Sequence, residues 1–65
     1  MPPLDLLEFH VEQWDAADVR LERVIAASDH LLVAKAAFSE AVRLMPTMRL
    51  YLRHRARIVE KHEPE

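Results

Sequence analysis

The chain has 65 residues, no cysteine, no glycine and a net charge of −2, and 51% of its residues are hydrophobic and 31% charged. This length allows one domain, and the lack of cysteine excludes disulfides and zinc sites built on thiolates. The apolar content excludes an intrinsically disordered chain, and the acidic balance argues against simple coating of nucleic acid. A domain this small is marginally stable alone, which favours association with a second copy or another protein.

The first predicted element is a helix over about residues 4–27. Apolar residues recur three or four positions apart in this stretch, as expected for a stripe along a helix: Leu4, Leu7, Val11, Trp14, Leu21 and Ile25. The chain has no glycine and only four prolines, near its ends and at position 46, so no helix breaker interrupts this stretch. Asp18 is the polar exception on the stripe. We interpret it either as a candidate for setting register or oligomeric state, or as a residue turned to water.

The second predicted element is a longer helix over about residues 29–62, preceded by a turn at about residues 28–29. The apolar stripe shifts by one position there, and Ser28 or Asp29 can cap a new helix. The stripe of the second helix is clean: Leu31, Ala34, Phe38, Ala41, Met45, Met48 and Leu52. Pro46 lies inside this helix, so a kink or a break is expected near residues 45–46.

These elements predict an all-α protein in which two helices form an antiparallel hairpin. One flank of the hairpin is charged, and it is expected to pair Glu8 with Arg49. The other flank is mostly apolar and is the predicted oligomer interface: Ala17, Val24, Ala37, Leu44, Tyr51 and Ile58. Two such apolar flanks packed together would give a homodimeric four-helix bundle.

The stretch 49–61, RLYLRHRARIVEK, contains the candidate contacts to a partner: Arg49, Arg53, Arg55, Arg57 and Lys61. Residues 1–30 have a net charge of −5 and residues 31–65 one of +3. The basic residues therefore either pair with acids, of this chain or of a protein partner, or contact nucleic-acid phosphates. The acidic half would oppose a bound phosphate backbone, so nucleic acid is the less favoured partner.

No catalytic, cofactor or metal site is predicted. The histidines form no HExxH or ExxH motif, and a phosphate-binding loop cannot form without glycine. No signal peptide or membrane span is readable, and a cytoplasmic location is expected. The sequence therefore favours a small, non-enzymatic protein–protein interaction module that homo-oligomerises and regulates or scaffolds a larger partner. The alternative is a nucleic-acid-binding regulator that uses its arginine-rich C-terminal part.

Overall fold

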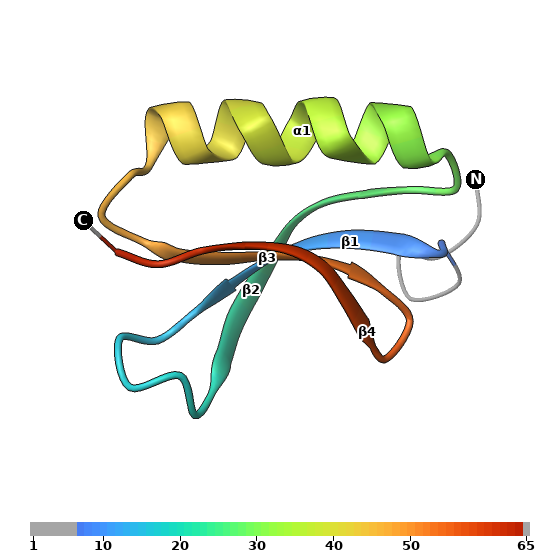
Figure 1. The fold of residues 1–65 in the computed structure, drawn as a ribbon. Coiled ribbons are helices and arrows are strands. Elements are labelled where there is room, and N and C mark those ends of the chain that lie inside the picture. Colours follow the sequence, from blue (N-terminus) through green and yellow to red (C-terminus); the bar gives the residue numbers. More distant parts are fainter. Residues whose placement is uncertain (1–6, 65) are drawn as a thin grey trace.

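The computed structural model describes residues 7–64 and shows a four-stranded antiparallel sheet with a helix across one face (Figure 1). The elements follow the chain as β1 (Phe9–Trp14), β2 (Leu21–Ser28), α1 (Leu31–Leu44), β3 (Arg49–His54) and β4 (Arg57–His62). The strand order is β2-β1-β3-β4, so β1 and β3 are the central strands. Because β2 and β3 are both antiparallel to β1, α1 connects two parallel strands that have β1 between them. The fold is therefore a split β-α-β unit with a fourth strand added at the edge.

The prediction of an all-α protein is wrong, and the described residues contain neither the helical hairpin nor the helices of a four-helix bundle. The stretches 9–14, 21–28, 49–54 and 57–62 are strands. The pattern that distinguishes these strands from a helix is the alternation of successive side chains between the two faces of the sheet. In β3, Leu50 and Leu52 are fully buried beneath α1, whereas Tyr51 between them is on the opposite face. The three-residue spacing that suggests a helical stripe places Val11 and Trp14 on opposite faces of β1.

The loops of both hairpins turn without glycine, so a chain that lacks glycine can still form this antiparallel sheet. Asp18 in the first loop has φ 60°, and Arg55 in the second has φ 56°. A short Asp side chain tolerates this left-handed conformation, whereas for most other residues it costs roughly 1 kcal/mol or more. The first loop is held by Asp15, whose carboxylate accepts hydrogen bonds from the backbone N–H groups of Val19 at 2.8 Å and Arg20 at 3.2 Å.

Helix α1 is shorter than predicted at both ends. Its N-cap is His30, whose Nδ1 accepts a hydrogen bond from the Leu32 N–H at 3.2 Å, and Ser28 instead accepts the N–H of His30 at 3.0 Å. The helix ends at Leu44, directly before the C-cap Met45. Pro46 therefore terminates the helix and does not kink it, because a proline disfavours helical conformation in the residue before it.

The core lies between α1 and the sheet. Its buried residues are Val11, Ala34, Phe38, Ala41, Leu50 and Leu52. The helical members of this set belong to the predicted apolar stripe, so that part of the pattern was interpreted correctly. Within the described residues, α1 covers one face of the sheet only, and the opposite face is called the uncovered face below. No helix within residues 7–64 has the length and apolar character needed to cross a bilayer.

Candidate functional site

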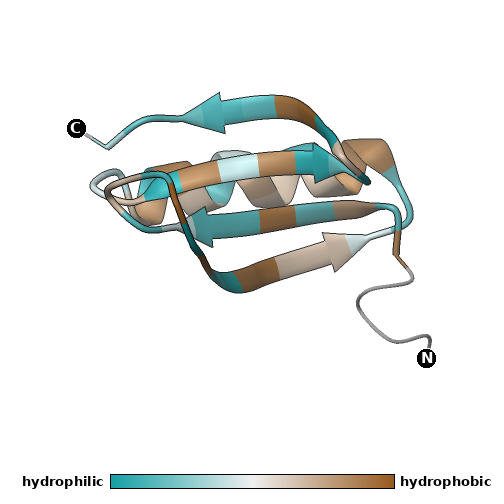
Figure 2. Cartoon of the chain, turned by 90° about the horizontal axis from the view of Figure 1, so that it is seen from below, coloured by the Kyte–Doolittle hydropathy of each residue, from teal (hydrophilic) through white to brown (hydrophobic). Residues whose placement is uncertain are grey.

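The uncovered face consists of side chains that alternate with the core residues along each strand. The register pairs His10 with Arg53, Glu12 with Tyr51, and Trp14 with Arg49 across β1 and β3. Directly opposed residues of antiparallel strands lie on the same face. Figure 2 views the sheet from this side and shows the alternation of polar and apolar residues along the central strands. Val24 of β2 and Ile58 and Lys61 of β4 extend the face toward the two edges.

Glu12 is at the centre of this face. Its side chain is only 7% exposed, and a buried carboxylate needs compensating partners. Glu12 Oε1 accepts a hydrogen bond from Trp14 Nε1 at 3.0 Å and lies 3.6 Å from Arg53 Nε. Its other oxygen lies 3.9 Å from His10 Nδ1. Glu12 therefore organises three surrounding side chains from two adjacent strands.

Two aromatic rings and one guanidinium pack beside Glu12. The rings of Trp14 and Tyr51 meet edge to face, with centroids 5.9 Å apart. The guanidinium carbon of Arg53 lies 5.8 Å from the centroid of the Trp14 ring. Both geometries are favourable, because the ring face is electronegative and the ring edge electropositive. Trp14 and Arg53 remain partly exposed, whereas Tyr51 is only 6% exposed.

The loop between β1 and β2 is fastened to β3 by polar contacts. Tyr51 donates a hydrogen bond to Asp18 Oδ1 at 2.6 Å, and Arg49 donates one to the Ala16 carbonyl at 3.1 Å. Arg49 also forms an ion pair with Glu63. Asp18, the candidate register residue of the helical prediction, is thus a loop residue that attaches the first hairpin to β3.

The hydrogen bond to Asp18 raises the pKa of Tyr51 above its ordinary value, and burial raises this pKa further. A raised pKa means that the folded state favours the protonated phenol. The resulting stabilisation is fully present below the unfolded pKa of about 10, and it is lost as the pH rises through the folded pKa.

We therefore expect an alkaline absorbance titration of the folded protein to give a tyrosine pKa above 10. Tyr51 is the only tyrosine of the chain, so the signal is unambiguous. Asp18→Asn should lower this pKa, because it removes the carboxylate charge that favours the protonated phenol. The exposed Asp29→Asn is the matched control and should leave it unchanged. A wild-type pKa equal to that of the Asp18→Asn protein would contradict the role of this hydrogen bond.

The residues predicted as one oligomer interface are distributed over the fold. Val24, Tyr51 and Ile58 are on the uncovered face, on three different strands. Ala37 packs against the core on the opposite side of the sheet, and Leu44 is exposed at the end of α1. Ala17 is exposed in the first loop. The structure thus brings together half of this set and separates the rest.

The basic residues of the C-terminal stretch are separated in a similar way. Arg49, Arg53 and Lys61 are on the uncovered face, whereas Arg57 lies opposite His54 on the helix side of β4. Arg55 at the turn pairs with Glu8 at 3.2 Å. The expected pair of Glu8 with Arg49 is not formed, because these residues lie at opposite ends of the central strands.

The central residue of the face, Glu12, was not identified from the sequence. The helical pattern makes Trp14 a core residue and Glu12 one more acid of a solvated helix. The signal for the site was the alternation FHVEQW, in which His10, Glu12 and Trp14 occupy every second position. This alternation covers only six residues, and such a short run does not distinguish a strand from part of a helix.

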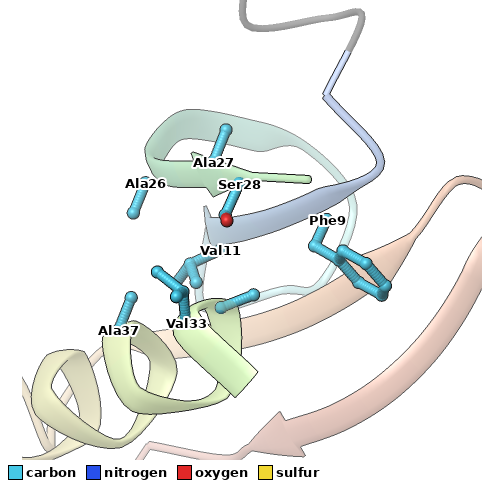
Figure 3. Close-up of a pocket in the computed structure, with 8 residues that line it drawn as sticks. Phe9, Val11, Ala26, Ala27, Ser28, Val33 and Ala37 are labelled. Carbon is cyan, nitrogen blue, oxygen red and sulfur yellow. The ribbon is translucent and has the colours of Figure 1, made fainter. Parts of the chain in front are cut away.

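The helix side of the sheet has a small apolar pocket of about 120 Å³ beside β2 (Figure 3). Residues from β1, β2 and the first half of α1 line it: Phe9, Val11, Ala26, Ala27, Ser28, Val33, Ala34 and Ala37. The pocket exists because small side chains face each other where the helix crosses β2. Its size suits one aliphatic side chain.

No protein-family model matches this chain, and neither a curated protein nor a solved structure is significantly similar to it. Within residues 7–64, no group of three or more His, Asp or Glu side chains is placed to hold a metal ion. Fold and site together define a small α+β protein with a helix-covered face and an uncovered face that carries a Trp, Tyr, Arg and Glu cluster.

Proposed function

We propose that this protein is a small, non-enzymatic protein–protein interaction module that binds an acidic segment of a larger protein on its uncovered face. The binding would regulate or scaffold that larger protein. The observation that carries the proposal is the partly exposed Arg53 guanidinium, which lies against Trp14 and directly opposite Ile58. Tryptophan, tyrosine and arginine are the residue types most enriched at the energetic centres of protein interfaces.

The β3–β4 half of the face defines the chemistry of the partner. Ile58 is 47% exposed, and the side chain of Arg53 is 30% exposed. Lys61 lies opposite Tyr51 on the same face. Within the described residues, Arg53 donates no hydrogen bond, so its terminal N–H groups are available to a carboxylate. The surface therefore suits a segment in which acidic side chains flank an apolar one.

The network beneath this surface supports tight binding. Glu12 holds Trp14 and Arg53 in place, and Tyr51 is fixed by Asp18. Side chains that are already ordered lose less conformational entropy when a partner binds.

The alternative function is binding of single-stranded nucleic acid on the same face. Aromatic and arginine side chains on the central strands of a sheet are a common platform for stacked bases. The burial of Tyr51 argues against it, because a ring that is 6% exposed cannot stack on a base. The carboxylates of Glu12 and Asp18 would also repel phosphates.

We also place the module in the cytoplasm as part of this proposal. The chain contains no cysteine, so its fold does not depend on an oxidising compartment.

The test is a titration with labelled probes at about 50 and 200 mM salt. The probes are a peptide of alternating glutamate and leucine, its lysine–leucine counterpart, and single-stranded RNA and DNA. We expect the acidic peptide to bind and the basic one not to. Arg53→Ala or Lys61→Ala should each weaken binding about tenfold, as for the loss of one charge-assisted contact.

Arg55→Ala is the matched control, because Arg55 is at the turn and already pairs with Glu8. This variant should bind the acidic peptide as the unmodified protein does. Absence of acidic-peptide binding would refute the proposal. Sub-micromolar binding of an oligonucleotide that collapses at high salt and needs Arg53 and Lys61 would establish the alternative.

A further inference from the structure

The two edge strands of the sheet differ in their protection against pairing with another strand. Charged side chains on an edge strand discourage such pairing. The edge strand β4 carries Arg57, Glu60 and Lys61, whereas β2 has no charged residue from Val24 to Ser28. Figure 2 shows this contrast as a mostly hydrophilic β4 and a largely apolar second half of β2. Within the described residues, β2 pairs only with β1, so its outer backbone groups have no strand partner.

The apolar pocket lies directly beside this uncharged half of the edge strand. Ala26 and Ser28 of β2 form one wall, and Val33 and Ala37 of α1 form another (Figure 3). Val33 is 56% exposed, which is unusual for a valine that borders an apolar pocket. The edge of β2, the pocket and the first turns of α1 therefore form one apolar surface, distinct from the uncovered face.

We propose that a second copy of this chain occupies this surface. In this dimer the two β2 strands pair antiparallel about a two-fold axis, which gives one continuous eight-stranded sheet with both helices on the same side. The inference is independent of the acidic partner, because the proposed acidic site lies on β3 and β4, whereas this pairing uses the opposite edge of the sheet at β2.

The sequence of β2 is complementary to itself in one register. An axis between Ile25 and Ala26 places Val24 opposite the partner's Ala27, and both of these positions are on the uncovered face. The same register places Arg23 opposite the partner's Ser28, and both are on the helix side. The bulge at Ile25 makes this face-to-face match possible, because it shifts the alternation by one residue. No charged residue faces another charged residue in this six-residue pairing.

The position of α1 supports contact between the two helical layers. The helix contacts β2, β1 and β3, so it lies above the centre of the sheet near β1. In the paired sheet, the two β1 strands would be three strand spacings, or about 14 Å, apart. Packed helices lie about 8–10 Å apart. The remaining space is bordered by both pockets, and the exposed Val33 of each copy can fill it.

A second copy is favoured over a different strand-donating protein for two reasons. The first is that a chain of 65 residues without disulfides gains stability from association. The second is that other copies of the chain are present wherever the chain itself is. The charged edge of β4 then stops further addition, so the assembly closes at the dimer and does not continue as a fibre.

The test measures the mass of the full chain by light scattering and sedimentation over a wide concentration range. We expect a dimer at micromolar concentration. Val33→Glu and, separately, Ala27→Arg should raise the dimer dissociation constant at least about tenfold. The first would bury an unpaired charge between the two helices, and the second would put a long charged side chain directly opposite the partner's Val24. Leu32→Glu is the matched control, because Leu32 is 68% exposed and lies on the side of α1 opposite the buried Ala34, Phe38 and Ala41, and it should leave the dissociation constant unchanged.

Circular dichroism should show that all three variants remain folded. Amide exchange of residues 24–28 should slow as the protein concentration rises. A folded monomer at every concentration would overturn the proposal. A dimer whose dissociation constant is raised by neither Val33→Glu nor Ala27→Arg would overturn it equally, because the copies would then associate elsewhere.

Discussion

Replacing Leu50 with alanine is expected to remove most of the stability of this protein. Leu50 is 0% exposed and packs in the core between the sheet and α1. Truncation of a buried leucine costs about 2–5 kcal/mol, because it leaves a cavity that the surroundings fill only partly. A single domain of this size has a total stability of roughly 3–10 kcal/mol, so the loss is a large fraction of the whole. Urea denaturation followed by Trp14 fluorescence measures it.

Leu44→Ala is the control for this change, because Leu44 is mostly exposed on α1. Its effect should stay within about 0.5 kcal/mol. The comparison also tests the fold, since the helical prediction leaves Leu50 outside its apolar stripe and places Leu44 in the oligomer interface. Equal effects of the two substitutions would be incompatible with the sheet described above.

Glu12→Ala is expected to destabilise the protein by about 1–3 kcal/mol, because it removes the acceptor of the Trp14 indole N–H and the charge partner of the buried Arg53 Nε. The indole N–H of Trp14 and the Nε of Arg53 both face the Glu12 carboxylate. Glu12→Gln retains an acceptor for Trp14 and removes only the charge, so it should destabilise less. The difference between the two variants measures the contribution of the ionised carboxylate, and it is obtained from urea denaturation at neutral pH.

Glu60→Ala is the matched control, because Glu60 is an exposed glutamate on the edge strand β4. It should change the unfolding free energy by no more than about 0.5 kcal/mol. If Glu12→Ala were as mild as Glu60→Ala, the polar cluster of the uncovered face would not be a stabilising network. The preorganisation that supports the proposed binding function would then be absent.

Part of the candidate site could be predicted from the sequence. Because basic residues are frequent in residues 49–61, the sequence identifies Arg53 and Lys61 as candidate contacts to a partner. The sequence did not identify their neighbours, because Trp14 and Glu12 are about 40 residues away along the chain. Arg53 meets them only because β3 pairs with β1. A helix would instead have grouped Arg49, Arg53, Arg57 and Lys61 on one surface, and the sheet separates them.

The buried face of α1 and an interruption at Pro46 could also be predicted from the sequence, although the predicted helix continued to residue 62. Both are local properties: side chains three and four positions apart share one face of a helix, and proline disfavours helical conformation in the residue before it. Ala34, Phe38 and Ala41 are accordingly buried, and the helix ends just before Pro46.

The strands were decided only by the tertiary structure. Each of β1, β3 and β4 has six residues, and such a segment is stable only when it pairs with another strand. The partners that decide its conformation are distant in sequence, and strand propensity depends on that context. The two hairpin turns could not be predicted from the sequence for the same reason. Asp18 and Arg55 adopt positive φ without being glycine, and contacts made across the fold hold them there: Asp18 with Tyr51, and Arg55 with Glu8. The sequence by itself therefore determined the buried face of α1 and its interruption at Pro46, whereas long-range pairing determined the sheet and the face on which the candidate site is built.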